Sequence, residues 1–400
     1  MAEVTVRPEI AAIVDRIDAL RPMLIERARE GEELRRIPED VFQAVADTGA
    51  FTISVPTKFG GLAANTRECH AVARAIARGD GALAWVTGIL DSGAWVLGLM
   101  DERAQADVWG PDGSLNDFVS IVLATTSEST RVDGGYRVSG TWGYGTGSQH
   151  AAWSLLGMPL TNDAGEVVDA GLALIQTSEL TFKDNWYVAG MKGTGSVMQI
   201  AEDVFVPDHR VLPLAAAVEG GYLDDNPELS YRTVFVPSLF MKLIGPNLGM
   251  GRAALDYVIE KAESKSIAYT GYEKQADSAM FQVAVARASV RLEAVELMAA
   301  DVADEIYAGA ERDYYAPYPE RLAMRAKAAW VVETVTETIN DLVTAHGSAG
   351  FAESALIQRV WRDQATASRH GHTLSASGYE AFGKVVFDRE EEARSVLPVV

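Results

Sequence analysis

Cysteine is almost absent from this sequence of 400 residues, in which Cys69 stands alone. A single cysteine excludes an intrachain disulfide, and it also excludes a Cys-x-x-Cys redox or zinc pair. Positive charge is scarce as well, because 35 Lys and Arg residues are opposed by 56 Asp and Glu residues, for a formal net charge of −21. Nucleic acid is therefore not an expected partner, since contacts with phosphates need clustered Lys and Arg.

Long apolar runs are missing too. The sequence has no run of roughly 18 apolar residues, which is about the length that a membrane-spanning helix needs. Residues 1–8 lack the charged-then-apolar pattern of a signal peptide, so we expect a cytoplasmic protein. Hydrophobic residues make up 48% of the chain, which is ample for a large core and for more than one domain.

Three motifs that often indicate a bound ligand do not fit their context here. His370 and His372 are two residues apart, so a helix would point them to different faces, and no His-Glu-x-x-His motif supports a metal site. Gly249–Ala254 spells Gly-x-Gly-x-x-Ala but follows a helical rather than a strand pattern, which argues against a dinucleotide-binding turn. Gly378–Lys384 spells Gly-x-x-x-x-Gly-Lys, but Val385 replaces the Ser or Thr that a phosphate-binding loop needs.

The spacing of apolar residues divides the chain into three segments. Residues 1–113 have helical spacing, residues 114–213 read as short strands separated by turns, and residues 214–400 return to helices. In the middle segment, residues 136–142 alternate between apolar or small and polar directly after the Asp133-Gly134-Gly135 turn, as in a hairpin. The order of helices, strands and helices predicts an α+β chain.

The third segment carries two long apolar stripes, which are typical of helix-bundle cores. The first consists of Phe281, Ala284, Ala288, Leu292, Val295 and Ala299, and the second of Val331, Val335, Ile339, Leu342 and Ala345.

Several sequence blocks, in their order and spacing, resemble the acyl-CoA dehydrogenase superfamily. The resemblance is strongest to its branch of two-component, reduced-flavin-utilising monooxygenases, which includes the oxygenase component of p-hydroxyphenylacetate hydroxylase and secondary-metabolite aromatic and indole hydroxylases. The most specific block runs from Gly134 to Ser148 and contains Gly-Thr-Trp-Gly-Tyr-Gly-Thr-Gly-Ser. The other blocks cover residues 37–61, 105–110, 186–196, 204–210, 346–350 and 362–363.

The resemblance implies a fold and a cofactor. The expected architecture is an N-terminal α-helical domain over residues 1–113, a middle β-barrel over 114–213 and a C-terminal four-helix bundle over 214–400. A flavin would lie between the barrel and the bundle, and a neighbouring subunit of a homo-oligomer, usually a tetramer, would help to hold it. Since no nicotinamide site is visible, a separate flavin reductase would supply reduced FAD, with FMN as the alternative, and O2 would be the co-substrate.

One position bears on which of the superfamily's two chemistries to expect. A dehydrogenase needs a carboxylate base near the C-terminus, after an Arg-Asp pair. Counting from Arg362-Asp363, that position falls on Gly371, and His370 lies beside it. A histidine near this point is what the monooxygenase branch implies. A glutamate on an earlier helix would instead restore a dehydrogenase, and the candidates are Glu260, Glu263 and Glu273.

An oxygenase of this branch implies a specific reaction. Reduced flavin would react with O2 to give a C4a-hydroperoxyflavin, whose electrophilic distal oxygen attacks an electron-rich aromatic carbon, as in a phenol or an indole. The site must exclude water and keep the proton on flavin N5, because losing that proton releases hydrogen peroxide. An acyl-CoA dehydrogenase, an N- or S-oxygenase of the same fold, and a helical scaffold that has lost its flavin remain alternatives.

The resemblance assigns catalytic roles to two residues. Thr146 occupies the hydroxyl position of the family's Trp-x-Thr or Phe-x-Ser motif and is expected to hydrogen-bond with flavin N5, while Tyr144 occupies the aromatic position. A spacing of two residues would place both on one face of a strand. His370 is expected to deprotonate or orient the substrate, because an unperturbed imidazole has a pKa of about 6.5.

The remaining candidates come from the same blocks and from the N-terminal helices. Flavin contacts are expected from Ser120, Tyr144, Thr146, Gly147, Ser148, Thr194, Gly195, Ser196, Gly347, Ser348 and Gly350. The glycines among them allow a close approach of the backbone to a ligand, and residues 347–350 would meet the flavin pyrophosphate or adenine through backbone amides. Trp85, Trp95 and His370 are expected to line the substrate pocket.

Overall fold

Helices form the first segment, as the sequence predicts. The computed structural model describes residues 6–111, 113–223 and 226–400, so residues 1–5 of the stretch compared with signal peptides lie outside it. The N-terminal helices are α1 (Pro8–Leu34), α2 (Glu39–Ala46), α3 (Thr66–Ala77), α4 (Gly81–Leu97) and α5 (Glu102–Trp109), with the 3-10 turn η1 (Thr57–Phe59) between α2 and α3. Within the described ranges, no helix is long and apolar enough to cross a membrane.

The α4 helix occupies the centre of the molecule. The carboxylate of Asp80 accepts hydrogen bonds from the backbone N–H groups of Ala82 and Leu83 at 2.9 and 3.2 Å, which satisfies donors that the start of a helix leaves unpaired. Every residue of the helix is buried. A helix without a polar face must lie in the interior, and α4 packs between the β region and the C-terminal helices.

The middle segment folds into two four-stranded sheets. The first has the strand order β1-β4-β5-β8 and the second has the order β2-β3-β7-β6. The strands are β1 (Val119–Val122), β2 (Ser127–Val132), β3 (Gly135–Gly145), β4 (Trp153–Thr161), β5 (Val167–Gln176), β6 (Thr181–Lys183), β7 (Val197–Pro207) and β8 (Val211–Pro213). Side chains from both sheets, among them Val138, Trp142 and Ile175, form one apolar core.

The predicted hairpin is confirmed. Strands β2 and β3 pair antiparallel across the turn, where Gly134 has a φ of +74° that suits glycine. Along β3, Val138 and Trp142 are buried, while the odd-numbered residues from 137 to 141 are exposed. The alternation stops after Trp142, because the pairing of β3 with β7 shifts register between Trp142 and Gly145.

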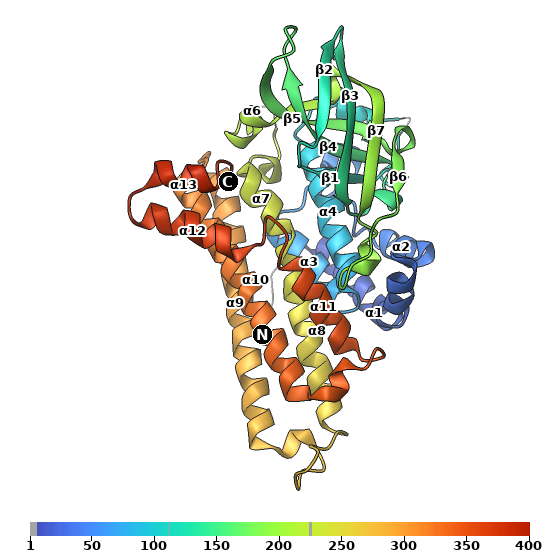
Figure 1. Ribbon diagram of the computed structural model, residues 1–400, viewed down its shortest axis with the longest axis vertical. Helices are drawn as coiled ribbons and strands as arrows, with labels where there is room; N and C mark the ends of the chain where they lie inside the picture. The colour runs from blue at the N-terminus through green and yellow to red at the C-terminus, as the bar shows by residue number, and fades with distance from the viewer. Residues whose placement is uncertain (1–5, 112, 224–225) are drawn as a thin grey trace.

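Long helices form the third segment. They are α6 (Leu214–Val218), α7 (Phe235–Lys242), α8 (Ile244–Ala262), α9 (Ala279–Glu311), α10 (Tyr318–His346), α11 (Leu356–Ala367), α12 (Ser375–Val386) and α13 (Glu390–Val396). Helices α8 to α11 pack as a four-helix bundle, and both predicted stripes face its core, with Ala284 and Ala345 half-buried. Helices α12 and α13 project to one side of the bundle (Figure 1).

The two helical segments share one continuous apolar core, and the β region sits above them (Figure 1). The chain changes from helix to strand between Trp109 and Val119, and it changes back at Pro213. The domain limits at residues 113 and 213 stay predictions. Gly249–Ala254 lies inside α8 and Gly378–Lys384 lies inside α12, so both glycine motifs are helical.

Candidate active site

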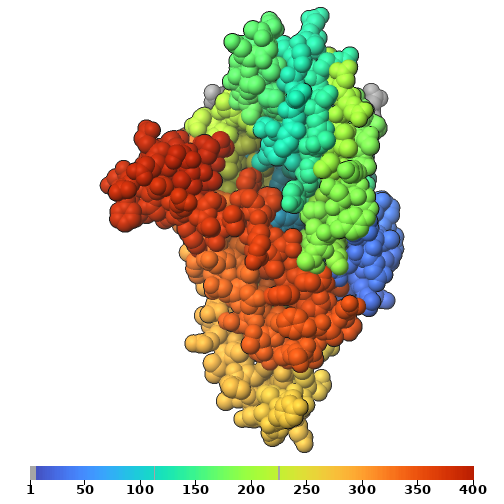
Figure 2. Space-filling model, in the orientation of Figure 1, coloured from blue at the N-terminus to red at the C-terminus, as the bar shows by residue number. Residues whose placement is uncertain are grey.

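A cavity of about 810 Å³ opens where the β region meets the bundle. Its lining comes from α4, β1, the end of β3, the loop between β6 and β7 (residues 184–196), α7, and α11 with the segment that follows it. Figure 2 shows the hollow between the green β region and the orange-red C-terminal segment, with blue residues at its floor. None of the described residues that line the cavity is an Asp or a Glu.

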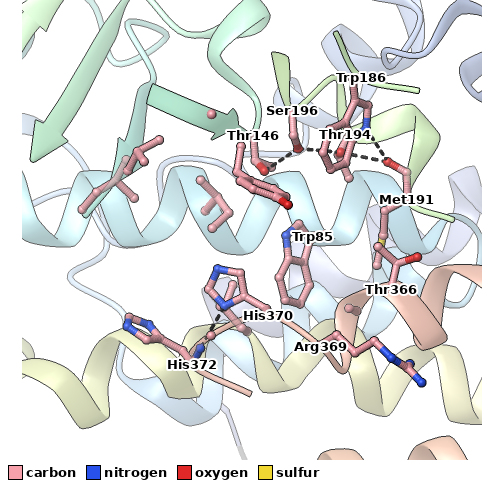
Figure 3. A pocket seen from close by; sticks show the side chains of 18 of the residues that line it. Trp85, Thr146, Trp186, Met191, Thr194, Ser196, Thr366, Arg369, His370 and His372 are labelled. Atoms are coloured by element: carbon pink, nitrogen blue, oxygen red, sulfur yellow. Dashed lines mark hydrogen bonds between the residues drawn. The ribbon is translucent and has the colours of Figure 1, made fainter. Parts of the chain in front are cut away.

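Three buried hydroxyl groups form a hydrogen-bonded chain on the β side of the cavity (Figure 3). Thr146 Oγ1 lies 2.6 Å from Ser196 Oγ, which in turn lies 2.7 Å from Thr194 Oγ1. The Thr194 hydroxyl donates to the backbone carbonyl of Met191 at 2.9 Å, and the indole N–H of Trp186 donates to the same oxygen at 3.0 Å. All three hydroxyl residues line the cavity. Each of them is a predicted flavin contact.

The hydroxyl chain has one direction, which the carbonyl of Met191 sets. A carbonyl oxygen can only accept, so Thr194 commits its single hydroxyl proton there. Ser196 must then donate to Thr194, and Thr146 must donate to Ser196, because each short contact between two oxygens needs a proton between them. The chain therefore ends at Thr146, whose oxygen lone pairs are left to accept a hydrogen bond from the cavity.

Tyr144 reaches the same cavity, but not through the predicted strand geometry. Strand β3 ends at Gly145, Tyr144 has a φ of +60°, and the N–H of Thr146 donates to the carbonyl of Tyr144 at 2.8 Å. The expectation that a two-residue spacing puts Tyr144 and Thr146 on one strand face is therefore wrong, because a register shift and a tight turn intervene. Tyr144 is 75% exposed and its ring meets Trp186 edge-on, so it lies at the mouth of the cavity.

Two histidines lie on the opposite side of the cavity, in the segment that follows α11 (Figure 3). Burial, and then the charge of Arg325, lowers the pKa of His370 to about 4. Burial, and then His370 and Arg325, lowers the pKa of His372 to about 3. Both imidazoles are therefore neutral near pH 7. In the part of the chain that the structure describes, no cluster of His, Cys, Asp and Glu could hold a metal ion.

His370 offers the cavity a hydrogen-bond donor. The backbone N–H of His372 donates to Nδ1 of His370 at 3.2 Å, so Nδ1 carries a lone pair and the proton of the neutral ring belongs on Nε2. The ring packs edge-on against Trp85, with 5.4 Å between the ring centroids. This tautomer favours the orienting role predicted for His370 over the deprotonating role, which would need a lone pair on Nε2.

Arg325 of α10 lies behind the histidine segment. Its guanidinium donates to the carbonyl of Gly371 at 2.6 Å, and the residue is only 3% exposed. Burial lowers its pKa to about 10, so the group stays charged at neutral pH. No carboxylate of the described residues forms an ion pair with it, so the segment that carries both histidines rests on an uncompensated positive charge.

Four other predicted flavin contacts lie behind the three hydroxyl residues instead of on the cavity surface. The hydroxyl of Ser120 donates to the carbonyl of Thr146 at 2.9 Å, and the hydroxyl of Ser148 donates to a β3 carbonyl at 2.7 Å. Gly147 and Gly195 have φ values of +72° and +56°, which suit glycine. In this chain the four residues support the turns that hold Thr146 and Ser196.

The two predicted pocket tryptophans lie in different surroundings. Trp85 lines the cavity. Trp95 does not: it is 2% exposed, its indole N–H donates to the carbonyl of Ser230 at 2.7 Å, and its ring packs against Phe235. The expectation for Trp95 is therefore wrong. Because α4 is buried on every face, apolar spacing cannot tell the face that meets the cavity from the faces that meet the core.

Gly347, Ser348 and Gly350 also lie away from the cavity. They follow the end of α10, at the 3-10 turn η9 (Ser348–Phe351), and the length of α11 separates them from the histidine segment. The structure therefore does not bring them together with Thr146 within one chain.

The glutamates that would restore a dehydrogenase are not in the cavity either. Glu260, Glu263 and Glu273 are exposed near the end of α8 and in the loop that follows it. Gly371, on which the expected position of a dehydrogenase base falls when counted from Arg362-Asp363, does line the cavity.

Sequence reasoning missed several residues that build the site. Trp186 and Met191 line the cavity, and Asp363 accepts a hydrogen bond from the backbone N–H of Met191 at 2.5 Å. Leu239 of α7 and Leu243, directly after that helix, also line the cavity. Trp186 and Asp363 both belong to the family-like blocks, and those blocks were the available signal.

Comparison with known proteins agrees with this architecture. The chain matches the family models "Acyl-CoA dehydrogenase, N-terminal domain" over residues 10–112 and "Acyl-CoA dehydrogenase, C-terminal domain" over residues 243–374. It is 33% identical to the flavin-dependent monooxygenase oxygenase subunit HsaA of Rhodococcus jostii (strain RHA1), over 92% of this chain and 97% of that protein. It is 30% identical to the oxygenase component of the FADH2-dependent resorcinol hydroxylase of Rhizobium sp. (strain MTP-10005), over 90% of each chain.

A solved structure gives the same result in three dimensions. XiaF from Streptomyces sp., in complex with FADH2 and glycerol, matches with a TM-score of 0.88 at 30% identity, over 95% of this chain and 96% of XiaF. These similarities extend over nearly the whole chain, including the helices, the sheets and the segments that line the cavity. The chain therefore belongs to the acyl-CoA dehydrogenase superfamily and, within it, to the oxygenase subunits of flavin-dependent monooxygenases.

Proposed function

We propose that this protein is the oxygenase component of a two-component system that uses reduced flavin and O2 to hydroxylate an electron-rich aromatic substrate of the phenol or indole type. One observation carries the proposal: a hydroxyl chain that ends in an acceptor at Thr146 faces a neutral histidine donor across a cavity whose described lining holds no carboxylate. A dehydrogenase would need a base at that place.

The residues of the β-side wall fit a reduced flavin. Reduced flavin carries a proton on N5, and the free lone pairs of Thr146 are suited to accept a hydrogen bond from it. The flavin, when bound, supplies the electrons with which O2 is activated for transfer of one oxygen atom. Reduced FAD is the preferred cofactor, with FMN as the alternative, because XiaF binds FADH2 and the resorcinol hydroxylase depends on FADH2.

The residues of the bundle-side wall fit an aromatic substrate with an oxygen or nitrogen substituent. Trp85, Trp186, Leu239 and Leu243 provide apolar surface, which excludes water and packs against a ring. The Nε2–H of His370 is placed to donate to a substituent of that ring and so to orient the carbon that is oxidised. A phenol is the first substrate to test, because the similar protein from Rhizobium is named as a resorcinol hydroxylase.

A flavin reductase and further copies of this chain are the proposed protein partners. Four exposed apolar residues recur along one face of α9: Met280, Val283, Val290 and Leu297. Exposed apolar stripes of this kind mark protein contacts, so we expect a homo-oligomer, with a tetramer as the first expectation. In such an assembly, residues 347–350 would be available to a flavin held mainly by a neighbouring copy.

Isotope incorporation tests the proposed reaction. The protein would be mixed with a flavin reductase, NADH, FAD and resorcinol or indole under isotopically heavy O2. We expect a hydroxylated product that contains one heavy oxygen atom, and no product when either the reductase or the oxygenase is omitted.

An acyl-CoA substrate provides the opposing outcome. Under anaerobic conditions, the oxidised holoenzyme would be mixed with an acyl-CoA in the absence of reductase. Bleaching of the flavin would show dehydrogenation and would overturn the oxygenase proposal.

A further inference from the structure

The loop between β6 and β7 forms much of the β-side wall with little regular structure of its own. It contributes Trp186, Met191, Thr194 and Ser196 to the cavity, yet its only regular element is the 3-10 turn η4 (Lys192–Thr194). Met191 has φ +57° and ψ +29°, a left-handed conformation that is unfavourable for a residue with a Cβ atom. Such a backbone persists only where surrounding contacts hold it.

Two neighbouring residues of α11 hold this loop against the bundle. The Oδ1 atom of Asp363 accepts the N–H of Met191 at 2.5 Å, and the guanidinium of Arg362 donates to the carbonyl of Ala189 at 2.6 Å. Between these contacts, a Cβ atom on Gly190 would lie 2.0 Å from the carbonyl oxygen of Arg362. The backbone of the loop therefore lies directly on α11, and glycine is needed there.

Asp363 is not placed for an ion pair. It is 2% exposed, and its described hydrogen-bond partner is the amide of Met191 rather than a Lys or an Arg. The charged groups around it are Asp80, which caps α4, Glu32 of α1, and Arg359 and Arg362 of its own helix. Burial, and then Asp80 and Glu32, raises the pKa of Asp363 to about 7, so its negative charge is unfavourable in the folded protein. A costly buried carboxylate that serves one backbone amide points to a role other than stability.

We propose that Asp363 is a positioning residue for oxygen transfer, which fixes Met191 so that the hydroxyl chain keeps its direction and Thr146 remains an acceptor. This inference rests on the proposed function. The N–H of Met191 is held by Asp363, and its carbonyl receives the hydroxyl of Thr194. If the peptide of Met191 rotates, the hydroxyl of Thr194 loses its carbonyl acceptor. The three hydroxyl groups can then donate in the opposite direction. Thr146 would then point an O–H toward the position at which the N5–H of reduced flavin needs an acceptor.

Three variants separate positioning from general loss of structure. Asp363→Ala removes the acceptor for the Met191 amide, whereas Asp363→Asn keeps a carbonyl oxygen at the same place and removes the charge. Asp80→Asn is the matched control, because Asp80 is a nearby buried acid with a raised pKa that caps α4 and makes no hydrogen bond with Met191. Asn caps helices as well as Asp does, so the control should keep its fold.

The first measurement is amide hydrogen exchange of residues 184–196 in the flavin-free protein. Exchange should be about tenfold faster in Asp363→Ala, as expected when a buried N–H loses its acceptor, and close to wild type in the two Asn variants. The second measurement is coupling, the amount of hydroxylated product per reduced flavin consumed. Coupling should fall several-fold in Asp363→Ala, with a matching rise in hydrogen peroxide, and should be retained in Asp363→Asn.

Two results would overturn the positioning role. One is wild-type exchange and coupling in a folded Asp363→Ala variant. The other is a loss in Asp363→Asn as large as in Asp363→Ala. If Asp363→Ala does not fold, Asp363→Asn still tests the proposal. Uncoupling in Asp363→Asn would contradict it, because that variant keeps the acceptor oxygen. Absence of hydroxylated product from the wild type would defeat the proposed function, and the exchange measurement would still test the anchoring of Met191.

Discussion

The two walls of the cavity leave opposite kinds of hydrogen-bonding atoms for a ligand. On the β side, the protons of Thr194, Ser196 and Thr146 all have acceptors within the protein, and the lone pairs of Thr146 remain. On the bundle side, Nδ1 of His370 has a donor within the protein, and the Nε2–H remains. One wall accepts and the other donates, so a cofactor N–H and a substrate oxygen or nitrogen would find different partners.

The walls also differ in how firmly they are held. The hydroxyl residues are at most 5% exposed and their hydrogen-bonded chain ends on a backbone carbonyl, while His370 and His372 are only half-buried. A rigid wall suits a cofactor that binds in the same way in every turnover. A looser wall over the charge of Arg325 suits substrates that differ in shape. Substitutions on the two sides of the cavity should therefore impair the reaction in different ways.

Loss of the donor at His370 should have the largest effect. His370→Ala removes the group that orients the substrate, and the rate of hydroxylation of a phenol should fall by about a hundredfold, the size of effect that a misplaced substrate can produce. His370→Gln keeps an N–H donor on a side chain of similar length and should retain much more activity. Product formation under saturating reduced flavin measures both, and equal activity of the alanine variant would place the orienting group elsewhere.

The pH dependence sharpens this prediction. The pKa of His370 is lowered to about 4, so the ring gains a proton only below about pH 4 and stays neutral as the pH rises. The wild-type rate should therefore show no step from His370 near the ordinary imidazole pKa of about 6.5. A step there that disappears in His370→Gln would contradict the neutral donor.

A substitution on the β side should uncouple the reaction. Reduced flavin would still be oxidised by O2, but more of it would yield hydrogen peroxide and less would yield product. Thr146→Val keeps the branched shape but removes the acceptor, so the ratio of product to hydrogen peroxide should fall by about tenfold, the effect of one lost buried hydrogen bond. Thr146→Ser keeps the hydroxyl and should stay close to wild type. An unchanged ratio in the valine variant would remove Thr146 from the mechanism.

Removing the charge behind the histidines should have a smaller effect. Arg325→Met keeps much of the side-chain volume but loses the hydrogen bond to Gly371 and the positive charge. The pKa values of His370 and His372 should rise, because that charge is one of the causes that lower them. The KM for the substrate should rise several-fold as the segment loosens. Imidazole titrations by NMR measure the pKa values, and unchanged titrations would show that burial alone sets them; Arg325→Lys is the control that keeps the charge.

Much of the fold could be predicted from the sequence. The three segments, the hairpin before β3 and the bundle stripes follow from spacing alone, because periodicities of two and of 3.6 residues report directly on strands and helices. The placement of Thr146, Thr194, Ser196 and His370 around one cavity came from the family resemblance instead. No local pattern reports that residues so far apart in the chain will face each other.

Other features depend on contacts that a sequence does not display. Asp363 is visible as part of an Arg-Asp pair, but its role depends on Met191, which reaches it from the β region. The direction of the hydroxyl chain depends on which group accepts from Thr194, a tertiary detail. Tyr144 and Thr146 were placed by strand alternation, which fails where β3 shifts register.

The two tryptophans of α4 offer the comparison with the smallest expected effect on activity. Trp95→Phe removes the indole N–H that donates to Ser230 within the core, so it should lower the free energy of unfolding by about 1–3 kcal/mol and change the KM for substrate by less than about twofold. Trp85→Phe changes a surface of the cavity that packs against His370, so it should raise the KM several-fold with little loss of stability. Chemical denaturation and steady-state kinetics on both variants measure this contrast. The opposite pattern, with Trp95 governing KM and Trp85 governing stability, would mean that the substrate lies along another face of α4 and that the histidine segment is not its wall.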